Sequence, residues 1–158
     1  IVCRGANMML GYYKNPEATA QIIDVNGWLH TGDLGVMDEE GYVTVRGRSK
    51  NMLLTSSGQN IYPEEIESKL NNMPYVSESL IVLQHDKLVA LIYPDFDDAF
   101  AHSLQQTDIE KAMEANRNEL NLLLPAYCQI TKVKIHFEEF EKTAKKSIKR
   151  FMYQEAKG

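Results

Sequence analysis

The pattern of hydrophobic and polar positions changes near residue 50. Before it, glycine, proline and asparagine recur every few positions, which favours short strands joined by turns. A short helix is expected after Pro16, because proline suits a first helical position and Glu17 suits the positive end of a helix. β-forming residues on both sides of the acidic turn 38–41 predict a hairpin within residues 28–46.

After residue 50 the predicted elements are longer and alternate between strand and helix. The apolar run 52–54 predicts a short strand, and the polar residues 56–59 predict a loop. A helix is expected to begin at Pro63, because glutamates follow in its first turn and apolar residues recur at helical spacing. The β-rich runs 79–83 and 88–93 flank a polar turn and predict an antiparallel hairpin.

The last third of the chain adds one more helix and one more strand. The sequence Thr-Asp-Ile-Glu at 107–110 is a capping box, so we expect a helix that begins there and stops at Pro125. Residues 133–137 predict a final strand. This order predicts an α+β domain in which helices pack on a short antiparallel or mixed sheet, with a domain boundary at residues 47–51.

Composition and charge narrow the class of protein. A chain of 158 residues with 44% hydrophobic content can bury a core, and its net charge of -5 argues against general nucleic-acid binding. Cys3 and Cys128 belong to no cysteine or histidine cluster, and the acidic groups at 95–98 and 138–141 are interpreted as solvated turns, so no metal site is expected.

No apolar run approaches the roughly 18 residues that a transmembrane helix needs. We therefore expect no transmembrane segment. The two cysteines, interpreted as reduced thiols, favour a cytoplasmic location, with peripheral membrane association as an alternative. The chain opens on Ile1 without a signal-peptide pattern, which suggests an excised segment of a larger protein.

Three positions carry candidate chemistry. Asp33 follows a glycine at a strand end, where a carboxylate can accept two hydrogen bonds from the vicinal diol of a ribose, or can simply close a turn. Arg48 can pair with a phosphate or a ribose, or can form a surface ion pair. Gly58 lies in the loop 56–60, either as an ordinary loop glycine or where a ligand passes close to the backbone.

In their fixed order, these motifs resemble the adenylate-forming superfamily, which includes acyl-CoA synthetases, luciferases and the adenylation domains of peptide synthetases. The resemblance covers essentially the whole chain, and it is carried by residues 11–17, 28–33, 47–50, 58–67 and 143–150. The segments most similar to the long-chain fatty acid branch are residues 50–52, 58–61 and 148–151.

The resemblance implies a role for each matching position. Asp33 would bind the ribose hydroxyls of ATP, and Arg48 would bind the nucleotide from the other side. Lys50 would be the hinge between residues 1–49, the end of a large N-terminal domain, and residues 51–158, a mobile C-terminal domain.

The reaction of such enzymes explains why a hinge is useful. A fatty acid first attacks the α-phosphate of ATP to give an acyl-adenylate, and this step draws on Mg²⁺ and on a lysine near the C-terminus. CoA then attacks the adenylate, and a domain rotation brings the loop of Gly58, Gln59 and Asn60 towards the nucleotide.

One position departs from the family pattern. The register of the C-terminal motif places Ser147 where the catalytic lysine belongs, and a hydroxyl cannot supply that positive charge. Either neighbouring lysine, Lys146 or Lys149, could replace it; otherwise the enzyme relies on Mg²⁺ and large-domain cations, or adenylates poorly. We also expect Ile148, Phe151 and Met152 to pack rather than to bind a ligand.

The sequence therefore predicts the C-terminal part of a fatty acid–CoA ligase of lipid metabolism. The large N-terminal domain that would bind the acid and the ATP phosphates is missing, so the 158-residue chain by itself should be inactive. Two alternatives stay open: a weakly catalytic or regulatory nucleotide-binding relative, suggested by Ser147, and a ligase that loads an acyl-carrier protein instead of CoA.

Overall fold

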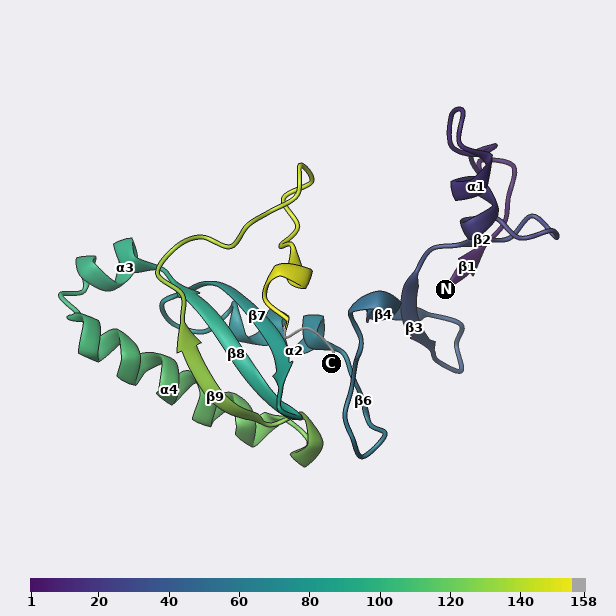
Figure 1. Ribbon diagram of the computed structural model, residues 1–158. Coiled ribbons are helices and arrows are strands. Elements are labelled where there is room, and N and C mark those ends of the chain that lie inside the picture. Colours follow the sequence, from purple (N-terminus) through teal and green to yellow (C-terminus); the bar gives the residue numbers. More distant parts are fainter. Residues whose placement is uncertain (155–158) are drawn as a thin grey trace. The chain divides into compact units, whose positions relative to one another are not determined.

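The structure is a computed structural model that describes residues 1–154 (Figure 1). The chain divides into two compact units, of which unit 1 is Ile1–Asn51 and unit 2 begins at Met52. The last four residues of the predicted C-terminal domain, 155–158, lie outside the described part of the chain.

Unit 1 consists of one helix and two small antiparallel sheets. Its elements are β1 (Val2–Cys3), α1 (Pro16–Ile22), β2 (Leu29–His30), β3 (Asp33–Met37), β4 (Val43–Arg48) and the 3₁₀ turn η1 (Ser49–Asn51). The predicted helix is confirmed, and the Asn15 side chain caps it by accepting the Ala18 N–H at 3.0 Å. The predicted hairpin is also confirmed, because β3 and β4 pair antiparallel across the acidic turn.

Unit 2 is a mixed three-stranded sheet with helices and a small hairpin. Its elements are β5 (Leu53–Leu54), β6 (Asn60–Ile61), α2 (Pro63–Leu70), β7 (Val76–Gln84), β8 (Lys87–Pro94), α3 (Phe96–Ala101), α4 (Gln106–Leu123), η2 (Ala126–Cys128), β9 (Ile130–Ile135) and η3 (Arg150–Met152). The strand order is β7-β8-β9, with β7 antiparallel and β9 parallel to β8. This arrangement confirms the predicted α+β class with helices on a mixed sheet.

The central sheet separates two hydrophobic layers. Alternate residues of β7 and β8, such as Ile81 and Ala90, face the buried apolar positions of α2 and α4. The intervening residues, Leu80 and Val89 among them, pack against Phe140 of the C-terminal segment, defined here as residues 138–154. Figure 1 shows α4 along one side of the sheet and the yellow C-terminal segment on the other.

Several boundaries differ from the sequence prediction for local reasons. The acidic residues 95–98 are not a solvated turn, because Asp95 accepts the Asp98 N–H at 3.0 Å and caps α3. The capping box of α4 does not begin at Thr107; the helix starts at Gln106, and the Asp108 carboxylate accepts the Gln105 N–H at 3.2 Å. The predicted strand 133–137 instead spans Ile130–Ile135, because its pairing with β8 begins at Ile130.

The packing expected of the C-terminal apolar residues is confirmed for only one of them. Ile148 is partly buried against the second hydrophobic layer. Phe151 and Met152 are 75% and 53% exposed, because the 3₁₀ turn η3 does not continue as a helix that would bring them to the sheet.

Candidate functional site

Asp33 and Arg48 lie side by side on the β3–β4 hairpin. They are direct cross-strand partners, and an Arg48 guanidinium nitrogen lies 3.0 Å from Oδ1 of Asp33. The same nitrogen, Nη1, donates to the Thr31 carbonyl at 2.8 Å. The two side chains are 33% and 51% exposed, so each keeps surface that a ligand could contact.

The backbone before Asp33 fixes the position of this pair. Gly32 has a φ of +76°, and a Cβ there would lie 3.5 Å from the Arg48 guanidinium. The Ser49 N–H donates to the Gly32 carbonyl at 2.9 Å, and the Asp33 N–H donates to the Thr31 hydroxyl at 3.1 Å. The structure therefore brings the two predicted nucleotide ligands together, and their role in binding a nucleotide stays a prediction.

Lys50 lies in η1, the 3₁₀ turn that ends unit 1, and is exposed. It stands one residue before the last residue of that unit, Asn51. Its role as a hinge stays a prediction.

Gly58 lies at the tip of the β5–β6 hairpin. Its φ is +79°, a value that strongly favours glycine, and nothing lies within 4 Å of the position that a Cβ would take. Its N–H donates to the Thr55 carbonyl at 2.9 Å. The neighbouring Gln59 and Asn60 are exposed as well, so the tip offers bare backbone to solvent.

Asp86, a residue that sequence analysis did not single out, holds this hairpin in place. Its Oδ1 accepts the Ser56 N–H at 2.8 Å, and its Oδ2 accepts the Ser56 hydroxyl. These two hydrogen bonds hold the pKa of Asp86 below its usual value. Asp86 forms the β7–β8 turn with a φ of +60°, a conformation in which glycine would be less strained.

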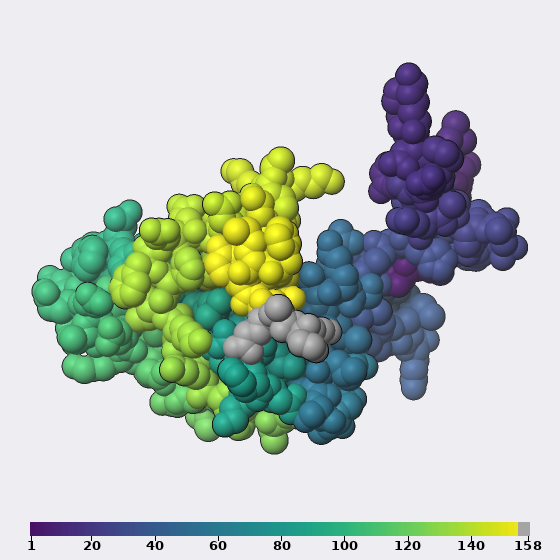
Figure 2. All heavy atoms as spheres, in the orientation of Figure 1, coloured from purple at the N-terminus to yellow at the C-terminus, as the bar shows by residue number. Residues whose placement is uncertain are grey.

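The candidate lysines lie on or beside a small loop of the C-terminal segment, residues 142–148, which we call the lysine loop. Its ends form an antiparallel bridge between Lys142 and Ile148, and the Thr143 N–H donates to the Ser147 carbonyl at 2.8 Å. Lys146 occupies the turn with a φ of +60° and is exposed. Figures 1 and 2 show this loop projecting from the surface of unit 2.

The structure distinguishes the two lysines that could replace the missing one. The Lys149 ammonium lies 3.2 Å from the Glu141 carboxylate, and its side chain is 34% exposed. Within residues 1–154, Lys146 forms no ion pair. Of these two lysines, Lys149 is paired with a carboxylate and Lys146 is not, and the role of either in catalysis stays a prediction.

A second interaction that sequence analysis missed lies beneath the lysine loop. Arg150 makes a two-point contact with Glu67 of α2, with Nη1 donating to Oε1 at 2.8 Å and Nη2 donating to Oε2. The Glu67 Oε1 also accepts the Ile81 N–H of β7 at 2.7 Å. The side chains of Arg150 and Glu67 are only 15% and 8% exposed.

Burial raises the pKa of Glu67, while Arg150 and the Ile81 amide oppose that effect. The two partners are 83 positions apart in the sequence, so no local pattern could have revealed this pair.

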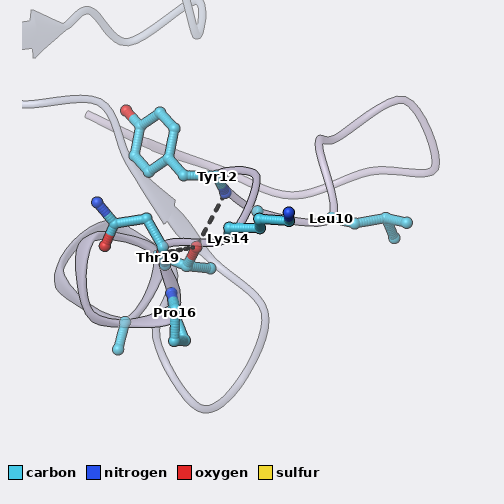
Figure 3. Close-up of a pocket in the computed structure, with 8 residues that line it drawn as sticks. Leu10, Tyr12, Lys14, Pro16 and Thr19 are labelled. Atoms are coloured by element: carbon cyan, nitrogen blue, oxygen red, sulfur yellow. Dashed lines mark hydrogen bonds between the residues drawn. The ribbon is translucent and has the colours of Figure 1, made fainter.

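Unit 1 also has a shallow depression of about 510 Å³ beside α1 (Figure 3). The Thr19 hydroxyl in its wall accepts the Tyr12 N–H and donates to the Asn15 carbonyl, both at 2.9 Å. The ionisable side chains in its lining are Tyr12 and Lys14.

Residues 1–154 offer no evident metal site and no membrane-spanning helix. No group of three or more histidine, cysteine, aspartate or glutamate side chains in that range could hold a metal ion. Over the same range, each helix is too short or too polar to cross a membrane.

Comparison with known proteins identifies many relatives. Residues 50–156 match the family described as AMP-binding enzyme C-terminal domain. The chain is 35% identical over 155 residues to a probable acyl-activating enzyme of Arabidopsis thaliana, covering 98% of this chain and 27% of that protein. It is 53% identical over 75 residues to a long-chain-fatty-acid–CoA ligase of Escherichia coli O157:H7, covering 48% of this chain and 13% of that one.

Solved structures of acid-activating enzymes have a fold similar to that of this chain. An anthranilate CoA ligase in complex with anthranoyl-AMP superposes with a TM-score of 0.74 at 27% identity, covering 96% of this chain and 27% of that chain. The matched segments therefore cover only 13% to 27% of the length of these relatives.

Proposed function

The chain belongs to the AMP-binding enzyme C-terminal domain family, and from this premise we propose that the whole protein is an ATP-dependent ligase that joins a carboxylic acid to CoA. The observation that carries the proposal is the Asp33–Arg48 pair, with a contact of 3.0 Å, placed directly before a segment that matches this family. An ionised carboxylate can accept hydrogen bonds from ribose hydroxyls, and a guanidinium can contact a phosphate.

The proposed acid is a fatty acid. The support is the 53% identity to a long-chain-fatty-acid–CoA ligase, over 75 residues. One relative at similar identity is named for a different acid: a protein of Rhodococcus jostii that is 49% identical over 82 residues is named as a ligase of a bicyclic propanoate. The reaction type, adenylation followed by thioester formation, is therefore the general proposal, and a fatty acid as the substrate is the more specific one.

In the first step, a carboxylate oxygen of the acid bonds to the α-phosphorus of ATP, and the bond to pyrophosphate breaks. Asp33 holds the ribose and Arg48 the nucleotide from the opposite side. Lys146 brings positive charge to the phosphoryl group, where negative charge gathers in the transition state. The Mg²⁺ of such reactions would be held mainly by the phosphates of ATP.

In the second step, the thiol sulfur of CoA bonds to the acyl carbon, and AMP leaves with the bonding electrons. We propose that rotation about Lys50 withdraws the lysine loop and presents the β5–β6 hairpin instead. Gly58 lies at the tip of that hairpin with no side chain, which leaves room for the pantetheine arm to pass its backbone.

Ser147 favours a second candidate function. A hydroxyl stands where the family pattern has a lysine, so a regulatory protein that binds a nucleotide without turnover is the alternative. A measurement of pyrophosphate release by the full-length protein, with a series of carboxylic acids, separates the two.

We expect release that depends on the acid and peaks with fatty acids, followed by thioester formation with CoA. ATP binding without release for any acid would refute the ligase and favour the regulatory protein. Thioester formation with a phosphopantetheine carrier protein but not with CoA would reassign the acceptor.

A further inference from the structure

We infer that the buried Glu67–Arg150 pair is the device that positions the lysine loop for the adenylation step, which makes both side chains positioning residues. This inference rests on the proposed function, because the position of the lysine loop matters for adenylation only if the protein is a ligase. Neither residue is proposed to touch ATP or the acid.

The pair joins three elements that belong to different layers of unit 2. Glu67 projects from α2, which packs on one face of the sheet, and the C-terminal segment that carries Arg150 packs on the other face. Both meet at β7, the edge strand of the order β7-β8-β9, where the Ile81 N–H donates to Glu67. The Glu67–Arg150 pair therefore connects the two layers at the edge of the sheet.

The geometry of the Glu67–Arg150 pair fixes the orientation of the Arg150 guanidinium as well as its distance from the Glu67 carboxylate. A planar guanidinium that binds both oxygens of one carboxylate has little freedom to rotate, whereas a lysine in the same place would be held at a single point. The third contact, from the Ile81 amide at 2.7 Å, fixes the carboxylate itself. The position of Arg150 is thus set relative to the backbone of β7.

Burial argues that the pair serves position more than stability. Taking two charges out of water carries a desolvation cost that their attraction repays only in part, and apolar residues of similar size often stabilise a protein as well or better. The raised pKa of Glu67 agrees with a site where desolvation outweighs the attraction. What a buried pair adds over an apolar contact is a defined geometry.

The lysine loop is fixed at both ends of its base, and Arg150 secures one of them. On the first strand, the Lys142 ammonium lies 2.8 Å from the Glu78 carboxylate of β7. On the returning strand, Ile148 packs in the second hydrophobic layer, two residues before Arg150. Between these anchors Lys146 and Ser147 are exposed, so the anchors decide where Lys146 emerges.

The test uses the double variant Glu67→Gln/Arg150→Met, which removes both charges together and leaves an amide oxygen to accept the Ile81 N–H. In the 158-residue chain, we expect amide hydrogen exchange across residues 140–150 to accelerate at least about tenfold, while the amides of β8 keep the protection of the wild type. Arg150→Lys keeps the buried positive charge but loses the two-point contact with Glu67. If the double variant folds poorly, this milder variant should show the same acceleration of exchange across residues 140–150.

The functional measurement compares the two half-reactions in the full-length protein. The double variant should lose at least about tenfold in acid-dependent pyrophosphate release, whereas thioester formation from supplied acyl-adenylate and CoA should change little. Leu120→Ala is the matched control. Leu120 is 1% exposed in the helical layer, so its truncation opens a cavity and lowers stability while leaving the Glu67–Arg150 pair in place. It should leave the ratio of the two half-reactions unchanged.

Unchanged exchange across residues 140–150, or adenylation within about twofold of the wild type, would overturn the positioning role. Equal losses in both half-reactions would also overturn it, because they would indicate a general structural effect. If the wild type itself releases no pyrophosphate with any acid, the proposed ligase fails, and the exchange measurement alone still decides whether the pair holds the loop.

Discussion

Replacement of Lys146 by glycine separates the chemistry of this side chain from its structural cost. Lys146 has a φ of +60°, and a non-glycine residue in that conformation costs about 1–2 kcal/mol. Glycine loses about 0.5–1 kcal/mol more conformational entropy on folding, which offsets part of that gain. Lys146→Gly should therefore leave the chain as stable as the wild type, or up to about 1 kcal/mol more stable.

The same substitution should impair adenylation. Removal of one group that stabilises developing negative charge in a transition state lowers kcat by about 10²–10³. We expect acid-dependent pyrophosphate release by the full-length protein to fall about a hundredfold, with no loss of thermal stability. Lys145→Ala is the control, because Lys145 carries the same charge one residue away and does not share the positive φ.

Two results would refute this reasoning. An adenylation rate near the wild-type value in Lys146→Gly would show that this lysine does not replace the missing one. An equal loss in Lys145→Ala would show that only the summed charge of the loop matters. Addition of Ser147→Lys to the Lys146→Gly variant should recover at least about tenfold of the lost activity, because it returns a cation to the position that the family pattern predicts.

The remaining predictions concern the hinge, the β5–β6 hairpin and the buried carboxylate. Lys50→Pro restricts the backbone at the proposed hinge, so one half-reaction should survive and the other fall; wild-type rates in both would contradict the hinge. Asp86→Gly suits the positive φ of its turn but removes both hydrogen bonds to Ser56, so hydrogen exchange in residues 55–59 should accelerate and thioester formation should slow more than adenylation. Burial raises the pKa of Glu67 above its ordinary 4.5, so its contribution to stability is present below that pH and is lost as the pH rises through the folded value. Urea denaturation should therefore show the stability of Glu67→Gln rising relative to that of the wild type as the pH increases above 4.5, and parallel stability curves would refute the shift.

Local chemistry made much of the fold predictable. Pro16 and Pro63 begin α1 and α2 because a first helical position needs no N–H, and β7 and β8 follow from two apolar runs around a polar turn. The helix α3 was missed, because Asp95 and its acidic neighbours suit a solvated turn as well as a helix start. Only the hydrogen bond to Asp95 in the folded chain distinguishes the two.

In the candidate site, too, some residues were predictable from the sequence and others depend on tertiary packing. Asp33 and Arg48 were named from motifs, and a hairpin with a predictable turn brings them together. The Glu67–Arg150 pair was not accessible to sequence reasoning, because it depends on the C-terminal segment crossing the sheet and meeting α2. Likewise, the exposure of Phe151 depends on the end of a short 3₁₀ turn, which hydrophobic spacing does not encode.

The most direct test of the account is a crystal structure of the complete polypeptide with a non-hydrolysable acyl-adenylate analogue. The account predicts that the Asp33 carboxylate accepts a ribose hydroxyl at about 2.5–3.0 Å and that the Arg48 guanidinium contacts the nucleotide. A structure in which an ordered nucleotide lies elsewhere, with Asp33 and Arg48 bonded only to each other, would contradict it.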